Sequence, residues 1–538
     1  MSVQYFDLGS VLSGLVLLHA NILVGDSLKE DFGLIIRNGK IVFVGPSAEV
    51  LRRIDAGDKV IDLNGKVVLP GLCDAHIHLL GLAIAHMMLD LRNVPSIKVL
   101  KDLVRRKAEE LGPGKWILGR GWDQEIFAEK RYPNRWDLDE VSPRNPVFLV
   151  RVCGHIAVAN TLALKIAGID KLTKDPPDGV IERADDGEPT GILREGALSL
   201  VRKVIPQPSM DDIERALEGV LQELLKVGLT TVHAVSVTRE ELTALQRLRE
   251  KGKLRLKVRV YLERGLLNDL KRLQTSVNAD DRVLRISGVK ILVDGSLGGR
   301  TAALMDAYSD DPGNKGELLM SRNELIDIFK LAKNLGIQVA VHAIGDRALK
   351  EVLDAMEISG IQGDLIRIEH ASLISPVLLK RLRRLMPHIV VQPHFIITDW
   401  WIVRRLGEER ARWTYAFKTL LKSGLNVAAS SDAPVEPHNP WESIYAAITR
   451  GKYEGRELFK YTYMECLSLL DAIKMYTENA ARITGENAGI IEVGRDADLV
   501  VIDAHTLEMN ERNIRGVRIL AAIVNGEVVY QEENFKGR

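Results

Sequence analysis

Short apolar runs alternate with amphipathic stretches through the middle of the chain. Seven runs of strand length are separated by segments, several of which have helical spacing. Counting residues 67–72 or their continuation as a first run gives eight strands, the number that closes a parallel βα barrel. An open doubly wound sheet is the alternative, but no glycine-rich phosphate loop follows a first strand. The seven runs are Thr230–Val237, Lys257–Glu263, Gly288–Val293, Gln338–Ala343, Arg367–Ser372, Ile389–His394 and Asn426–Ser431.

Two of the intervening segments carry specific helix signals. Residues 209–228 place their leucines on one stripe at helical spacing. Ser321 and Glu324 form a capping box at the start of a second helix, and Gly336 ends it. Strand and helix therefore alternate as a (β/α)8 barrel requires.

Both ends of the chain have another pattern, in which short strands are joined by Asn-Gly turns such as those at 38–39 and 525–526. Chain termini often lie close together in space. We therefore expect residues 1–68 and 484–538 to form one small, composite β-sandwich domain, which leaves residues 69–483 for the barrel.

Residues 84–208 interrupt the alternation and hold much of the aromatic content. Loops that follow the strands of such barrels build the active site. This stretch is therefore interpreted as a large insertion after barrel strand 1, placed over the active site.

Composition narrows the classes of function. The 538 residues include 73 Lys plus Arg and 73 Asp plus Glu, so the formal net charge is zero and nucleic acid is not an expected partner. No apolar stretch reaches the roughly 20 residues that a membrane helix needs. The three cysteines form no CxxC pair, and the N-terminus lacks the basic region of a secretory signal. These features predict a cytoplasmic protein that binds no membrane, with a homodimer as the commonest assembly.

Candidate metal ligands follow several of the predicted strands. His76 and His78 lie two residues apart, so in an extended strand both imidazoles point to one side. Two hydrogen-bonded core histidines are the alternative for this pair. The prediction is strengthened because His342, His370 and Asp432 each come at the end of a later strand.

Lys290 lies inside an otherwise apolar strand, where an uncompensated ammonium is costly to bury. A lysine of lowered pKa is nucleophilic, and its reaction with carbon dioxide would give a carbamate, an anionic oxygen ligand. Four histidines, a carboxylate and a carbamate would then converge at the carboxyl ends of five strands.

These residues belong to longer motifs: Leu69–His78, Gly121-Trp122-Asp123, Gly154-His155, Asp294–Gly298, Val341–Asp346, Ile368-Glu369-His370, Gln392-Pro393-His394, Ser431–Pro434 and Gly494–Leu499. Through them, nearly the whole chain resembles the amidohydrolase superfamily, and within it the amidohydrolase 3 branch of metal-dependent hydrolases. The resemblance implies a (β/α)8 TIM barrel with a β-sandwich built from both termini.

The resemblance also implies a ligand set. His76, His78 and Asp432 would hold one metal, His342 and His370 would hold a second, and carboxylated Lys290 would bridge the two. An enzyme with one metal and an unmodified Lys290 is the alternative. Imidazole and carboxylate ligands favour zinc, with manganese, iron or cobalt as alternatives.

The implied function is hydrolysis of an amide-type C–N bond in a small-molecule substrate. Hydroxide would be generated from water on the metal, and Asp432 would act as general acid and base. The alternatives at the same site are ester or phosphoester hydrolysis, deamination and isomerisation, or a non-catalytic regulatory protein on the same fold.

Six further residues are candidates for substrate binding, each with a structural alternative. Trp122 is also a candidate core residue, and His155 a candidate structural hydrogen-bonding group. Asp294 and Arg300 belong to a glycine-containing turn after the Lys290 strand, where the glycines could serve only the turn. The remaining two, Gln392 and His394, end the seventh predicted strand.

Overall fold

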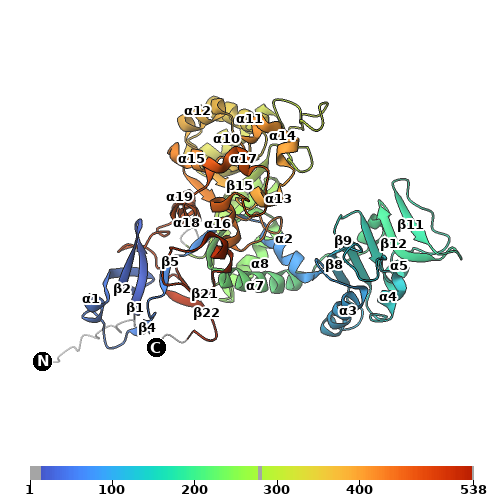
Figure 1. Cartoon of the computed structure of the whole chain (residues 1–538), viewed down its shortest axis with the longest axis horizontal. Coiled ribbons are helices and arrows are strands. Elements are labelled where there is room, and N and C mark those ends of the chain that lie inside the picture. The colour runs from blue at the N-terminus through green and yellow to red at the C-terminus, as the bar shows by residue number, and fades with distance from the viewer. Residues whose placement is uncertain (1–13, 277–280, 536–538) are drawn as a thin grey trace. The chain divides into compact units, whose positions relative to one another are not determined.

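The computed structural model describes residues 14–276 and 281–535 of the chain (Figure 1). It divides into two compact units, of which one comprises Met1–Gly81 with Leu217–Arg538 and the other comprises Leu82–Ala216. The first unit holds the barrel and the sheet from both termini, and the second has a sheet of its own.

Eight parallel strands form the barrel, in the order β6-β13-β14-β15-β16-β17-β18-β19. Backbone hydrogen bonds join its first and last segments, because the His78 N–H donates to the Ala433 carbonyl (2.9 Å) and the Asp432 N–H donates to the His76 carbonyl (2.8 Å). The predicted fold class is confirmed. The strands are β6 (Leu72–Ile77), β13 (Leu229–Val237), β14 (Lys257–Glu263), β15 (Leu284–Leu292), β16 (Gln338–Ala343), β17 (Ile366–His370), β18 (His388–Val391) and β19 (Val427–Ala429).

The first barrel strand begins later than residues 67–72. β5 (Val67–Pro70) pairs with the terminal sheet, and the chain enters the barrel only at β6. Gly71 separates the two strands, and a Cβ added there would lie 2.2 Å from the Thr230 Oγ1. Glycine therefore permits the close approach of the neighbouring strand. The continuation of the predicted run, rather than the run itself, is the barrel strand.

Helices connect the barrel strands, and the capping box and the glycine stop at residues 321–336 are both present. The Ser321 hydroxyl accepts from the Glu324 N–H, the Glu324 carboxylate accepts from the Ser321 N–H, and Gly336 adopts a left-handed φ of 65°. In the described part of the chain, no helix combines the length and apolarity needed to span a membrane. The helices of this unit from residue 210 onward are α7 (Met210–Lys226), α8 (Arg239–Glu250), η1 (Arg264–Asp269), α9 (Leu270–Ser276), α10 (Arg322–Leu335), α11 (Asp346–Ser359), η2 (Gly363–Leu365), α12 (Pro376–Leu385), α13 (Phe395–Thr398), α14 (Ile402–Ala411), α15 (Phe417–Lys422), α16 (Pro440–Thr449), α17 (Phe459–Thr462), η3 (Tyr463–Glu465), α18 (Leu469–Tyr476) and α19 (Glu478–Thr484).

Strands from both termini form one sheet in the order β22-β21-β20-β5-β1-β2-β3, with β4 paired to β1. The C-terminal β20 runs antiparallel to β5, so the chain returns to the sheet it began. Leu17, Ile36, Leu499 and Ile523 are among its core residues. The elements are β1 (Leu15–Val24), β2 (Ser27–Arg37), β3 (Lys40–Pro46), α1 (Ser47–Leu51), β4 (Lys59–Asp62), β5, β20 (Leu499–Ile502), η4 (Glu511–Gly516), β21 (Ile519–Val524) and β22 (Glu527–Gln531).

The second unit, Leu82–Ala216, includes residues 84–208 and has a mixed sheet in the order β11-β12-β10-β9-β8-β7. The expectation that it covers the active site stays a prediction. Its elements are β7 (Leu89–Asp90), α3 (Ile97–Leu111), β8 (Ile117–Trp122), α4 (Arg135–Asp139), β9 (Val147–Arg151), β10 (Ile156–Ala159), α5 (Thr161–Ile166), β11 (Gly179–Arg183), β12 (Pro189–Glu195) and α6 (Leu198–Arg202), and α2 (Leu79–Met87) leads into it.

Candidate metal centre

Three buried side chains from distant parts of the sequence meet at the carboxyl end of the barrel. His76 comes from β6, His370 ends β17 and Asp432 follows β19, and their ligand atoms all lie within 4.8 Å of one another. The Nε2 atom of His76 lies 3.3 Å from the Asp432 Oδ1. Barrel topology places these strand ends at one rim, as the sequence pattern predicts.

The backbone turns sharply at two of these residues. His370 has a φ of 73° and Asp432 a φ of 59°, a left-handed conformation that costs a non-glycine residue about 1 kcal/mol or more. Strain of this kind is concentrated at functional sites. At His370 it redirects the chain just after Glu369, so two consecutive side chains are both buried among the groups of this centre.

His78 and His342, two more of the predicted ligands, lie beside this group. The Nε2 atom of His78 is 3.3 Å from the Asp432 Oδ1, and the ring centroid of His342 is 4.4 Å from that of His370. The Nε2 atom of His342 is also 2.9 Å from the Gly295 carbonyl oxygen. Because a carbonyl only accepts, that Nε2 carries the proton, which leaves the Nδ1 lone pair of His342 available to a ligand.

Lys290 is buried in β15, and in the described part of the chain its Nζ has no hydrogen-bond partner. Burial lowers the pKa of Lys290 to about 8, while the carboxylates of Glu369 and Asp432 oppose the shift. A buried, unpartnered amine of lowered pKa is the chemical form that carbamate formation needs.

The donor set fits a divalent metal ion. Burial lowers the pKa of His342 to about 3 and holds that of His370 well below its ordinary value, so protons compete weakly for these imidazoles. Burial alone would raise the pKa of Asp432, but His76 and His78 hold it well below its usual range. Neutral imidazoles beside an ionised carboxylate are typical zinc ligands.

Two predicted substrate-binding residues lie beyond the seventh strand, because the chain leaves β18 at Val391. The Oε1 atom of Gln392 is 2.7 Å from the His370 Nδ1, so Gln392 contacts a candidate ligand directly. His394 is hydrogen-bonded through Nδ1 to the buried carboxylate of Glu436.

Asp294 and Arg300 have structural partners. Asp294 is fully buried, accepts from the N–H groups of Ala303, Ile344 and Gly345, and has its pKa raised to about 7 by burial. It thereby ties the loop after β15 to the loop after β16. Arg300 donates twice to the carboxylate of Asp310.

The other two candidates belong to the second unit. Trp122 is fully buried in that unit's core, where its Nε1 donates to the Leu149 carbonyl (2.9 Å). His155 is exposed, and its Nδ1 lies 2.8 Å from the Glu195 carboxylate, which raises the pKa of His155. Their roles as substrate contacts stay predictions.

Sequence reasoning missed the partner of His76. The Glu369 Oε2 lies 2.5 Å from the His76 Nδ1, and its Oε1 lies 2.5 Å from the Nε of Arg367. Burial alone would raise the pKa of Glu369, but Arg367 and His76 hold it well below its ordinary range. The sequence does contain a sign of this contact. Arg367 and Glu369 carry opposite charges two residues apart in an apolar strand, so their side chains face the same side.

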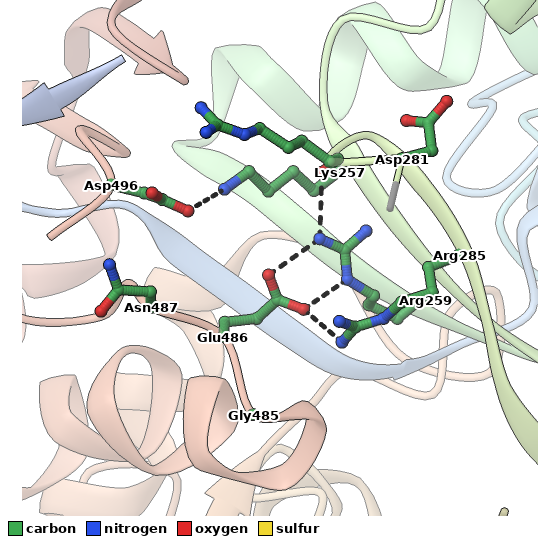
Figure 2. Close-up of a pocket in the computed structure, with 9 residues that line it drawn as sticks. Lys257, Arg259, Asp281, Arg285, Gly485, Glu486, Asn487 and Asp496 are labelled. Carbon is green, nitrogen blue, oxygen red and sulfur yellow. Dashed lines mark hydrogen bonds and ion pairs between the residues drawn. The ribbon is translucent and has the colours of Figure 1, made fainter. Parts of the chain in front are cut away.

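A second charged cluster lies at the amino ends of β14 and β15, remote from the candidate ligands along the strands. It lines a pocket of about 240 Å³. Figure 2 shows the carboxylate of Glu486 reaching Arg259 and Arg285, and Lys257 directed toward Asp496.

These features define the class of protein. The profile of the amidohydrolase family matches residues 59–530, and the chain belongs to this family. It is 32% identical over 481 residues to the putative amidohydrolase YtcJ of Bacillus subtilis, covering 88% of this chain and 90% of that protein. It is 29% identical over 539 residues to the N-substituted formamide deformylase of Arthrobacter pascens, covering 96% and 98%.

A solved structure supports the same assignment. The chain resembles an uncharacterized metal-dependent hydrolase from Pyrococcus horikoshii with 37% identity and a TM-score of 0.78, covering 93% of this chain and 99% of that one. Family, fold and candidate metal centre therefore agree.

Proposed function

We propose that this protein is a metal-dependent hydrolase that cleaves an amide-type C–N bond of a small molecule. The observation that carries the proposal is the convergence of His76, His370 and Asp432 within 4.8 Å in a buried part of the barrel. The similarity to an N-substituted formamide deformylase, whose name describes cleavage of this kind of bond, supports the choice of reaction.

In this proposal the centre would hold one or two zinc ions. His76, His78 and Asp432 would hold the first, and His342 and His370 would hold a second. Lys290, if carboxylated, would supply a further oxygen ligand. A bound divalent metal lowers the pKa of water toward neutrality and polarises the substrate carbonyl.

Asp432 is the proposed general acid and base. Its Oδ1 is 3.3 Å from the Nε2 atoms of both His76 and His78, so its position is fixed within the ligand group. It takes a proton from the attacking water and returns it to the leaving nitrogen when the tetrahedral intermediate collapses. Gln392 and His394 come directly after β18 in the sequence. They are the proposed substrate contacts within the barrel unit.

The test compares metal-free protein, prepared with a chelator, with the same protein reloaded with zinc. Substrates should include N-substituted formamides, other linear and cyclic amides, and an ester matched to each amide. We expect hydrolysis to depend on metal and kcat/KM to favour an amide over its matched ester. Hydrolysis that is unchanged after metal removal, or restricted to esters, would contradict the proposal.

A further inference from the structure

A chain of polar contacts runs through the barrel interior behind His76. The Oε2 atom of Glu369 lies 2.5 Å from the His76 Nδ1, and its Oε1 accepts from the Arg367 Nε at 2.5 Å. The Oε2 also accepts from the Arg367 Nη2 at 3.1 Å. All three residues are at most 1% exposed. Water therefore does not compete for these contacts, and the hydrogen-bond donors and acceptors fix one another.

The contact with Glu369 determines which nitrogen of His76 carries a proton. A carboxylate paired with a guanidinium is ionised and only accepts hydrogen bonds. The Nδ1 atom of His76 must therefore be the donor. The lone pair of neutral His76 then lies on Nε2, the atom that faces Asp432.

Arg367 is itself held on three further sides. Its Nη1 lies 3.0 Å from the His233 Nδ1, its Nη2 donates to the Ala75 carbonyl, and its guanidinium lies 4.3 Å from the centroid of the Tyr261 ring. A guanidinium only donates, so the His233 Nδ1 accepts and its Nε2 carries the proton toward the Cys73 Sγ at 3.5 Å. The guanidinium is thus fixed in position, and it fixes Glu369.

We propose that Glu369, held by Arg367, is a positioning residue that fixes the tautomer and ring orientation of His76 for metal binding. This inference rests on the proposed metal site. A carboxylate that accepts from the distal nitrogen of a ligating histidine orients the ring and raises its basicity. The alternative is that Glu369 serves only as the counterion of Arg367.

Zinc affinity separates these roles. Zinc binding to purified protein would be measured by competition with a chelator, for wild type, Glu369→Leu and the double variant Arg367→Met/Glu369→Leu. The double variant removes both charges, so it contains no unpaired buried guanidinium. We expect both variants to bind zinc about 10- to 100-fold more weakly than wild type. A folded double variant with wild-type affinity would overturn the proposal, because it lacks the group that accepts from the His76 Nδ1.

A second measurement needs no variant of the pair. In protein labelled with ¹⁵N-histidine, the His76 signals, assigned by their loss in His76→Asn, should show a proton on Nδ1. A His76 whose Nδ1 carries no proton would overturn the inference. Absence of zinc binding by wild type would instead contradict the proposed function, and the two failures are distinguishable.

Discussion

The two ends of the barrel both gather ionisable side chains, but they treat charge in opposite ways. At the amino end, Arg259 is 1% exposed and shares Glu486 with Arg285, and Lys257 lies 2.6 Å from Asp498. At the carboxyl end, histidines crowd around Asp432, and the Nζ of Lys290 lacks a hydrogen-bond partner in the described part of the chain. Hydrogen-bonded ion pairs characterise the first end, whereas a buried amine without a hydrogen-bond partner characterises the second.

This difference indicates what each end does. Removing one partner of a buried ion pair is costly, so we expect substitutions at the amino end to change stability more than turnover. The candidate ligand atoms at the carboxyl end lie close together, and a cation that bound them in the folded state would stabilise that state. Active sites of such barrels lie at the carboxyl end, as this reasoning requires.

The largest expected effect tests the carboxyl end. Asp432→Asn keeps an oxygen near His76 and His78 but removes the base. We expect much of the zinc to be retained while kcat falls about 10²- to 10⁴-fold. The control is Asp496→Asn, the same chemical change at the amino end, which should leave kcat unchanged. Normal turnover by Asp432→Asn, measured with metal content, would refute the assigned role.

Lys290→Met should separate activity from stability. The proposal expects kcat to fall at least about 100-fold, because the bridging group is lost. Metal-free protein should instead become more stable at pH 7. Lowering the Lys290 pKa from 10.5 to about 8 corresponds to about 3 kcal/mol. Urea unfolding of both proteins in chelator measures this change, and a loss of stability would show that the ammonium is compensated.

Candidate ligands can be predicted from the sequence because strand ends are visible as the polar ends of apolar runs. His342, His370 and Asp432 are predicted in this way, and the structure brings them to one end of the barrel. The role of Glu369 could not be predicted, since it depends on β6 and β17 facing each other across the barrel interior. Trp122 illustrates another limit, because an aromatic residue in an insertion is equally suited to a pocket or a core, and only the packing of β8 and β9 decides.

Whereas Lys290→Met should raise stability, Glu486→Gln should lower it. It leaves Arg259 and Arg285 without their carboxylate, and breaking a buried pair costs about 3–5 kcal/mol. We expect a lower free energy of unfolding with kcat close to wild type. The control is Glu492→Gln, whose exposed pair with Arg495 should contribute less than about 1 kcal/mol. A change in kcat of Glu486→Gln without loss of stability would contradict the assignment of the amino end to stability and the carboxyl end to catalysis.

The smallest expected effects lie in the pH dependence of stability. The contribution of Glu486 at the amino end should change in acid, and that of Lys290 at the carboxyl end should change in alkali. Arg259 and Arg285 hold the pKa of Glu486 below its ordinary 4.5 despite burial. The stability it contributes is therefore complete above about pH 4.5 and is lost as the pH falls, so Glu486→Gln should approach wild type in acid, by at most about 1.4 kcal/mol per pH unit.

The pKa of Lys290 is lowered instead. The free-energy cost of burying its ammonium is therefore complete below about pH 8 and declines as the pH rises toward 10.5. Lys290→Met should accordingly approach metal-free wild type only in alkali. Unfolding curves of the two variants from pH 3 to 10 measure both trends. If both variants approached wild-type stability over the same pH range, the two ends would not differ in how their buried charges are stabilised.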